Sequence, residues 1–138
     1  MKSTDNPPIF DIFPDLREKI SYINLDTKPT PVHRLENLGH KNLLIKRNDR
    51  ISPVYGGNKV RRLEFVLGDV LDKKQNRVVT MGAIGTNHGL ATAIFCKRLG
   101  LDCTLLLFDQ PVTEYVRRNL LLFQYHKLNM EYSGVWDW

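Results

Sequence analysis

The chain has few of the features that mark metal, disulfide or redox proteins. Its 138 residues include only two cysteines, Cys96 and Cys103, which do not form a CxxC pair. Each thiol falls in an apolar run, so both are expected to be buried, free and reduced. Histidines and carboxylates do not cluster around them, and the sequence therefore predicts no metal site.

Long apolar runs and blocks of like charge are also missing. No stretch approaches the roughly 18 apolar residues of a membrane span, and residues 1–13 lack the apolar core of a secretion signal. We therefore expect a cytoplasmic protein with no membrane partner. The net charge of +5 is scattered over short basic pairs without interleaved aromatic residues. A nucleic-acid-binding domain rests on that charge alone, and we expect no nucleic-acid partner.

Hydrophobic spacing from residue 59 onward switches between the helix and strand periods. The expected elements are a helix from 59 to 73 or 74, a strand at 77–81, a helix at 87–99, a strand at 102–108, a helix at 113–125 and a strand at 129–132. This order favours parallel pairing with right-handed crossovers. The sequence predicts an α/β fold, a three-layer open parallel sheet flanked by helices in a βαβαβ unit.

The first 58 residues give weaker signals. The expected elements are disorder at 1–8, a short helix at 14–20, an extended segment at 29–32, a loop at 33–40, a strand at 42–47 and a polar connection at 48–57.

The motif Gly56-Gly57-Asn58-Lys59 places an amine at the start of an amphipathic helix, behind a flexible Gly-Gly. A helix N-terminus carries unpaired N–H groups and partial positive charge, which favour a neutral amine over an ammonium and attract phosphate. Neutral amines attack aldehydes, so one helix start could hold a phosphorylated aldehyde covalently. The ordinary alternative is a turn followed by a solvated lysine.

A second motif follows the strand at 77–81 and reads Gly82-Ala83-Ile84-Gly85-Thr86-Asn87-His88-Gly89. It leaves the carboxyl end of a parallel strand and enters a helix, the place where ligands bind in such sheets. Gly82 and Gly85 permit close approach of a ligand to the backbone, and Thr86 or Asn87 could equally cap the helix. A dinucleotide loop is rejected because its third glycine and its acidic residue are absent.

Together the two motifs resemble the D-cysteine desulfhydrase and 1-aminocyclopropane-1-carboxylate (ACC) deaminase family. These are tryptophan-synthase-β-like, fold type II pyridoxal-phosphate enzymes. The resemblance runs from about residue 31 to about residue 132 and implies pyridoxal 5′-phosphate as cofactor. It implies that Lys59 binds the cofactor and, once released, moves a proton at or near Cα of the substrate. Arg62, one turn later, is a candidate phosphate ligand, and Asn58 is a candidate for orienting the loop.

The resemblance also gives roles to the second motif. Thr86, where the family usually has serine, is a candidate catalytic hydroxyl and substrate ligand. Asn87 corresponds to the residue that hydrogen-bonds the 3′-oxygen of the cofactor and is also a candidate substrate ligand. His88, a further candidate for substrate binding, agrees with the desulfhydrase-like branch rather than with the glutamine of the deaminases.

The implied activity is that of a lyase or deaminase which releases ammonia, and from D-cysteine also sulfide, from a small amino acid. Family members are more than twice this length, so we interpret the chain as an N-terminal fragment. Residues 1–58 are then a segment of the family's large domain, and 59–138 a truncated small α/β domain. We expect this chain alone to bind the cofactor weakly and to be inactive. The resemblance leaves a homo-oligomer open for the longer parent.

A truncated, non-catalytic paralogue that acts as an interaction module is the alternative, because an unpaired sheet edge is a template for association.

Overall fold

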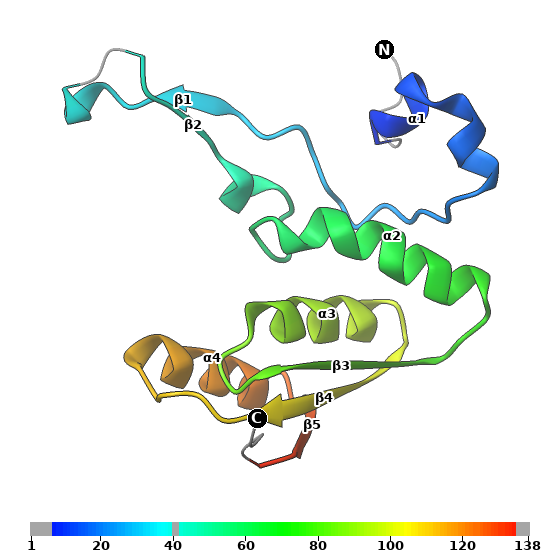
Figure 1. Ribbon diagram of the computed structural model, residues 1–138, viewed down its shortest axis with the longest axis vertical. Coiled ribbons are helices and arrows are strands. Elements are labelled where there is room, and N and C mark those ends of the chain that lie inside the picture. Colours follow the sequence, from blue (N-terminus) through cyan, green and yellow to red (C-terminus); the bar gives the residue numbers. More distant parts are fainter. Residues whose placement is uncertain (1–6, 40–41, 135–138) are drawn as a thin grey trace. The chain divides into compact units, whose positions relative to one another are not determined.

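The computed structural model describes residues 7–39 and 42–134 (Figure 1). The chain forms two compact units, Met1–Asp69 and Val70–Trp138, and each is described by itself. The division falls within helix α2 (Lys59–Asp72). The predicted domains, 1–58 and 59–138, concern a longer parent fold and stay a prediction. The predicted disorder at 1–8 lies largely outside the described residues.

The second unit is built on a parallel sheet. Its strands are β3 (Arg77–Ala83), β4 (Asp102–Phe108) and β5 (Asn129–Tyr132), in the order β3-β4-β5. All neighbouring strands run parallel, with Arg77 opposite Asp102 and Thr104 opposite Asn129. The predicted α/β fold, a parallel sheet flanked by helices, is confirmed. The strand at 102–108 and the strand at 129–132 have the predicted bounds.

Two helices connect these strands, α3 (Asn87–Arg98) and α4 (Glu114–Tyr125) (Figure 1). Right-handed crossovers between consecutive neighbouring strands put both helices on one face of the sheet, and α3 packs against β3, β4 and α4. Alternation along β4 directs Leu105 and Leu107 into the core beneath them. Phe95 of α3 and Phe123 of α4 are fully buried there, so the apolar stripes that predicted these helices form the core.

The first unit contains short elements before α2. They are α1 (Ile9–Ile12), η1 (Pro14–Glu18), β1 (Val32–Arg34), η2 (Glu36–Leu38), β2 (Leu44–Lys46) and η3 (Asn48–Arg50). Strands β1 and β2 pair antiparallel. The predicted strand at 42–47 is therefore present as β2, but the predicted loop at 33–40 was wrong in part, because β1 extends into it.

Glu64 of α2 connects this helix to the extended segment that precedes β1. Its side chain is only 2% exposed, and Oε1 accepts hydrogen bonds from the Tyr22 hydroxyl (3.3 Å), the Leu25 N–H (3.2 Å) and the Thr27 hydroxyl (2.6 Å). The backbone of Tyr22 also lies against Gly68, where an added Cβ would come within 2.8 Å of it. The carboxylate and the glycine together hold the segment against the helix.

Tyr22 gives this contact a measurable pH dependence. Burial, and then the neighbouring Glu64 carboxylate, raise the pKa of Tyr22 from 10.0 to about 12. The unfolded tyrosine ionises first, so the stability that Tyr22 contributes is complete below pH 10 and is lost as pH rises from 10 to about 12. We expect urea unfolding to show wild type losing stability relative to Tyr22→Phe across this range. A constant difference between the two proteins would contradict the assignment.

The two cysteine thiols lie against each other in the second unit, and neither is in a disulfide. Cys96 is buried as predicted, whereas Cys103 is only half-buried, because it lines an open hollow of about 360 Å³ with residues that include His126 and Lys127. The hydrogen bond between the two thiols lowers the pKa of Cys103, and the same bond together with burial raises the pKa of Cys96.

Within the described residues, no group of three or more metal-ligating side chains is present, and no helix is long and apolar enough to cross a bilayer.

Candidate functional site

Lys59 is the first residue of α2, as the sequence predicted. Its side chain is half-buried, whereas Asn58 before it and Arg62 one turn later are exposed. A 14-residue helix such as α2 presents unpaired N–H groups and partial positive charge at this end. The amine of Lys59 thus lies where an anionic group of a ligand is attracted.

The Gly-Gly turn before Lys59 is fixed rather than flexible. Gly57 adopts a φ of +98°, a conformation that favours glycine, and its N–H donates to the Asn48 carbonyl at 2.8 Å. Gly56 lies so close to η3 that an added Cβ would be 2.5 Å from the Asp49 carbonyl oxygen. Both glycines are therefore required by the backbone that enters α2.

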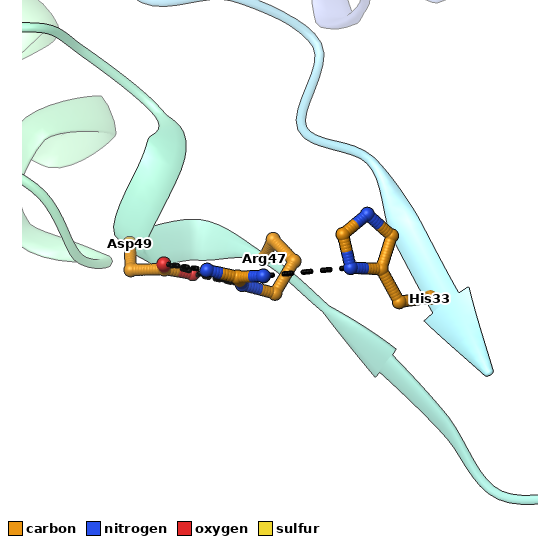
Figure 2. A network of polar contacts seen from close by, with 3 residues as sticks. All are labelled: His33, Arg47 and Asp49. Carbon is orange, nitrogen blue, oxygen red and sulfur yellow. Dashed lines mark hydrogen bonds and ion pairs between the residues drawn. The ribbon is translucent and has the colours of Figure 1, made fainter. Parts of the chain in front are cut away.

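A network of polar contacts among His33, Arg47 and Asp49 supports η3 (Figure 2). Arg47 donates from Nε to Asp49 Oδ1 at 2.9 Å and from Nη2 to Asp49 Oδ2 at 2.6 Å, and its Nη1 lies 3.4 Å from Nδ1 of His33 on β1. The bidentate pair raises the pKa of Arg47 and lowers the pKa of Asp49. His33, which the sequence left without a role, thus belongs to the support of the turn.

Thr86 is the N-cap of α3, where its Oγ1 accepts a hydrogen bond from the Gly89 N–H at 3.1 Å. Its side chain fills the space beside two glycines, because a Cβ added at Gly82 or Gly89 would lie 2.7 or 2.6 Å from Thr86 atoms. A Cβ at Gly85 would meet Gln110 and Val116. The space that a side chain would take at Gly82 or Gly85 is therefore filled by protein side chains, and close approach of a ligand to the backbone at these glycines stays a prediction.

Asn87 and His88 follow Thr86 in the first turn of α3, and both are exposed. Asn87 Oδ1 accepts a hydrogen bond from Asn119 Nδ2 of α4 at 2.9 Å, and the same nitrogen donates to the Gly85 carbonyl at 2.7 Å. Asn119 was missed from the sequence. The available signal was an amide within the apolar stripe of α4, three residues after Val116.

Each predicted site group is thus intact within its own unit. Asn58, Lys59 and Arg62 lie together at the start of α2, and Thr86, Asn87 and His88 lie together at the start of α3. Both helices belong wholly to the described part of the chain, and neither has an acidic residue in its first turn. An amine stands at the start of α2, and amide and hydroxyl groups stand at the start of α3, and each helix start by itself is a place that attracts anionic oxygens.

Comparison with known proteins decides the class. Residues 23–124 match the family model of pyridoxal-phosphate dependent enzymes. The chain belongs to this family. The match contains both motifs and Asn119, and it confirms the resemblance seen in the sequence. The enzymes of this family are described as dependent on pyridoxal phosphate.

Individual relatives agree. The chain is 43% identical to nocardicin C-9′ epimerase from Nocardia uniformis subsp. tsuyamanensis over 100 residues, which cover 72% of this chain and 31% of that protein. It is 40% identical to D-cysteine desulfhydrase from Klebsiella pneumoniae over 87 residues, 61% of this chain and 26% of that protein. A crystal structure of an ACC deaminase homologue superposes with a TM-score of 0.76 and 33% identity, over 96% of this chain and 39% of that one. The chain spans about a quarter to a third of the length of the curated relatives it matches.

Proposed function

We propose that this chain supplies part of a pyridoxal-phosphate lyase or deaminase that acts on a small amino acid and releases ammonia, and from D-cysteine also sulfide. One observation carries the proposal. Lys59 is the first residue of α2, and the turn before it is fixed by Gly57 at positive φ and by the close approach of Gly56 to Asp49. Such a rigid entry holds an amine in one place, as covalent attachment of an aldehyde requires.

The chemistry that the chain's residues perform follows from their positions. Bound pyridoxal phosphate supplies an electron sink that stabilises negative charge at Cα of an attached amino acid. Lys59 Nζ would hold the cofactor through its aldehyde, and the free amine would accept the proton from Cα of the substrate. Arg62, on the same side of the helix one turn later, stabilises the phosphate by its charge.

The start of α3 supports binding of the substrate carboxylate. The N-terminus of this 12-residue helix carries partial positive charge. The hydroxyl of Thr86 and the amide of Asn87 lie at the same helix start. The Thr86 oxygen accepts the capping hydrogen bond from the Gly89 N–H. The same oxygen stays available to the substrate carboxylate at the edge of this turn. His88 is the third member of this carboxylate-binding turn.

Epimerisation is the second candidate reaction. It is favoured by the 43% identity to nocardicin C-9′ epimerase. Both reactions begin with removal of a proton from the carbon next to the amine, so Lys59 has the same role in each. The reactions differ in the next step, since a lyase expels a leaving group and an epimerase returns the proton.

A segment exchange tests the proposal. Residues 23–124 of this chain replace their counterparts in the D-cysteine desulfhydrase of Klebsiella pneumoniae, of which about three-quarters lies outside the match. We expect this hybrid to bind pyridoxal phosphate and to release sulfide and ammonia from D-cysteine. Exchange of the Cα proton with deuterated water, without sulfide, would favour epimerisation. A hybrid that folds but neither binds the cofactor nor exchanges the proton would contradict the proposal and favour a non-catalytic interaction module.

A further inference from the structure

Asn119 is a buried polar residue in an otherwise apolar stripe. It lies on α4 between Val116 and Phe123, and only 4% of its surface is exposed. Burial of an amide is costly unless its groups are hydrogen-bonded. Nδ2 of Asn119 meets this requirement with two bonds, to the Gly85 carbonyl at 2.7 Å and to Asn87 Oδ1 at 2.9 Å. An apolar side chain here would take away the donor to the Gly85 carbonyl, and the second bond, to Asn87, goes beyond that need.

The two bonds fix which way the Asn87 amide faces. The Gly85 carbonyl can only accept, so the Asn119 atom beside it must be the nitrogen. That nitrogen carries two hydrogens, and the second is directed at Asn87. Asn87 must therefore turn its oxygen toward Asn119, and its own NH₂ group is the end that faces away from α4.

We propose that Asn119 is a positioning residue that holds Asn87 as a hydrogen-bond donor to an acceptor oxygen of the ligand bound beyond the carboxyl end of β3. The naming of this ligand as pyridoxal phosphate rests on the proposed function, and the orientation of the amide does not. A locked donor selects a negatively charged or carbonyl oxygen and disfavours an ammonium or another N–H at the same place. An unlocked amide could turn its oxygen outward and repel the same ligand oxygen.

Two substitutions separate positioning from simple packing. Asn87→Asp keeps an oxygen for Asn119 and places a negative charge in the first turn of α3, which the helix tolerates well, but it removes the donor. Asn119→Ala removes the lock and leaves the Asn87 amide in place. Asn87→Ala removes both the oxygen that accepts from Asn119 and the NH₂ donor. It is therefore the reference for loss of the hydrogen bond between Asn87 and Asn119.

The orientation is tested on the ¹⁵N-labelled 138-residue chain without ligand. We expect both side-chain NH₂ protons of Asn119 to exchange slowly with water in wild type and in Asn87→Asp, because both keep the two acceptors. In Asn87→Ala one of them should exchange faster. Rapid exchange of both protons in wild type, or loss of protection in Asn87→Asp, would overturn the inference whatever the ligand is.

The ligand is tested by titrating the same chains with pyridoxal phosphate, since side-chain NMR signals report even weak binding. We expect the Asn87 NH₂ signal of wild type to shift, and the apparent affinity to fall about tenfold in Asn87→Asp and in Asn119→Ala, the loss of one hydrogen bond to a charged oxygen. Equal affinity in all three chains would overturn the inference and leave the role of Lys59 standing. No shift of the Asn87 signal in wild type would overturn pyridoxal phosphate as the ligand at Asn87, whereas the proposed function is decided by the hybrid enzyme.

Discussion

Substituting Lys59 by alanine in the hybrid enzyme is expected to lower kcat/KM for D-cysteine by about 10²–10⁴-fold, the contribution of a positioned proton-transfer group. Alanine removes the amine that holds the aldehyde and accepts the Cα proton, while the helix start itself is preserved. Sulfide release over a range of substrate concentrations measures the effect. Lys73, just beyond the last residue of the same helix, supplies the matched control, and Lys73→Ala should leave kcat/KM unchanged.

Lys59→Arg sharpens this prediction. Arginine keeps a positive charge at the start of α2 but cannot form the bond to the aldehyde or accept a proton at neutral pH. It should therefore be as inactive as Lys59→Ala. Activity in Lys59→Arg close to that of the unsubstituted hybrid would show that Lys59 contributes only charge, and the proposed role would be wrong.

Glu64→Ala is expected to lower the free energy of unfolding of the chain by about 3 kcal/mol, because buried donors lose their acceptor. The Leu25 N–H and the Thr27 hydroxyl both donate to Glu64 Oε1. The methyl group of alanine cannot accept these hydrogen bonds. Glu64→Gln keeps an acceptor oxygen at the same place and should cost less, about 1 kcal/mol. Urea denaturation followed by circular dichroism measures both changes.

Glu36 offers the control for this prediction, since it is an exposed glutamate in the same unit. Glu36→Ala should change stability by less than about 0.5 kcal/mol, as is usual for surface positions. If Glu64→Ala behaved like Glu36→Ala, the hydrogen bonds to Glu64 would not be what holds the segment at Tyr22 to α2.

Periodicity predicted the parts of the fold that are long and buried. The strand at 102–108 was placed correctly because its apolar run is continuous. The helix that begins at Lys59 was placed correctly because its apolar stripe persists over two or more turns. Strand β1 (Val32–Arg34) was missed because three exposed residues carry no alternation that separates a strand from a loop. Its pairing with β2 is a contact across a connecting loop, which the residues of β1 themselves do not signal.

The site was predicted only as far as its motifs are local. Lys59, Thr86 and Asn87 stand in recognisable sequence around two helix starts, but Asn119 reaches Asn87 from 32 residues away along the chain. An asparagine on an amphipathic helix is ordinarily interpreted as solvated, and only the packing of α4 shows that this one is buried. Glu64 was missed for the same reason, since its buried position depends on the segment at Tyr22.

The central claim is that the amine of Lys59 forms the covalent bond to the cofactor. Reduction of the hybrid with borohydride after addition of pyridoxal phosphate, followed by peptide mapping, tests it most directly. We predict that the cofactor is recovered on the peptide that contains Lys59 and is lost from that peptide in Lys59→Ala. Recovery on another lysine, with Lys59 unmodified, would contradict the account.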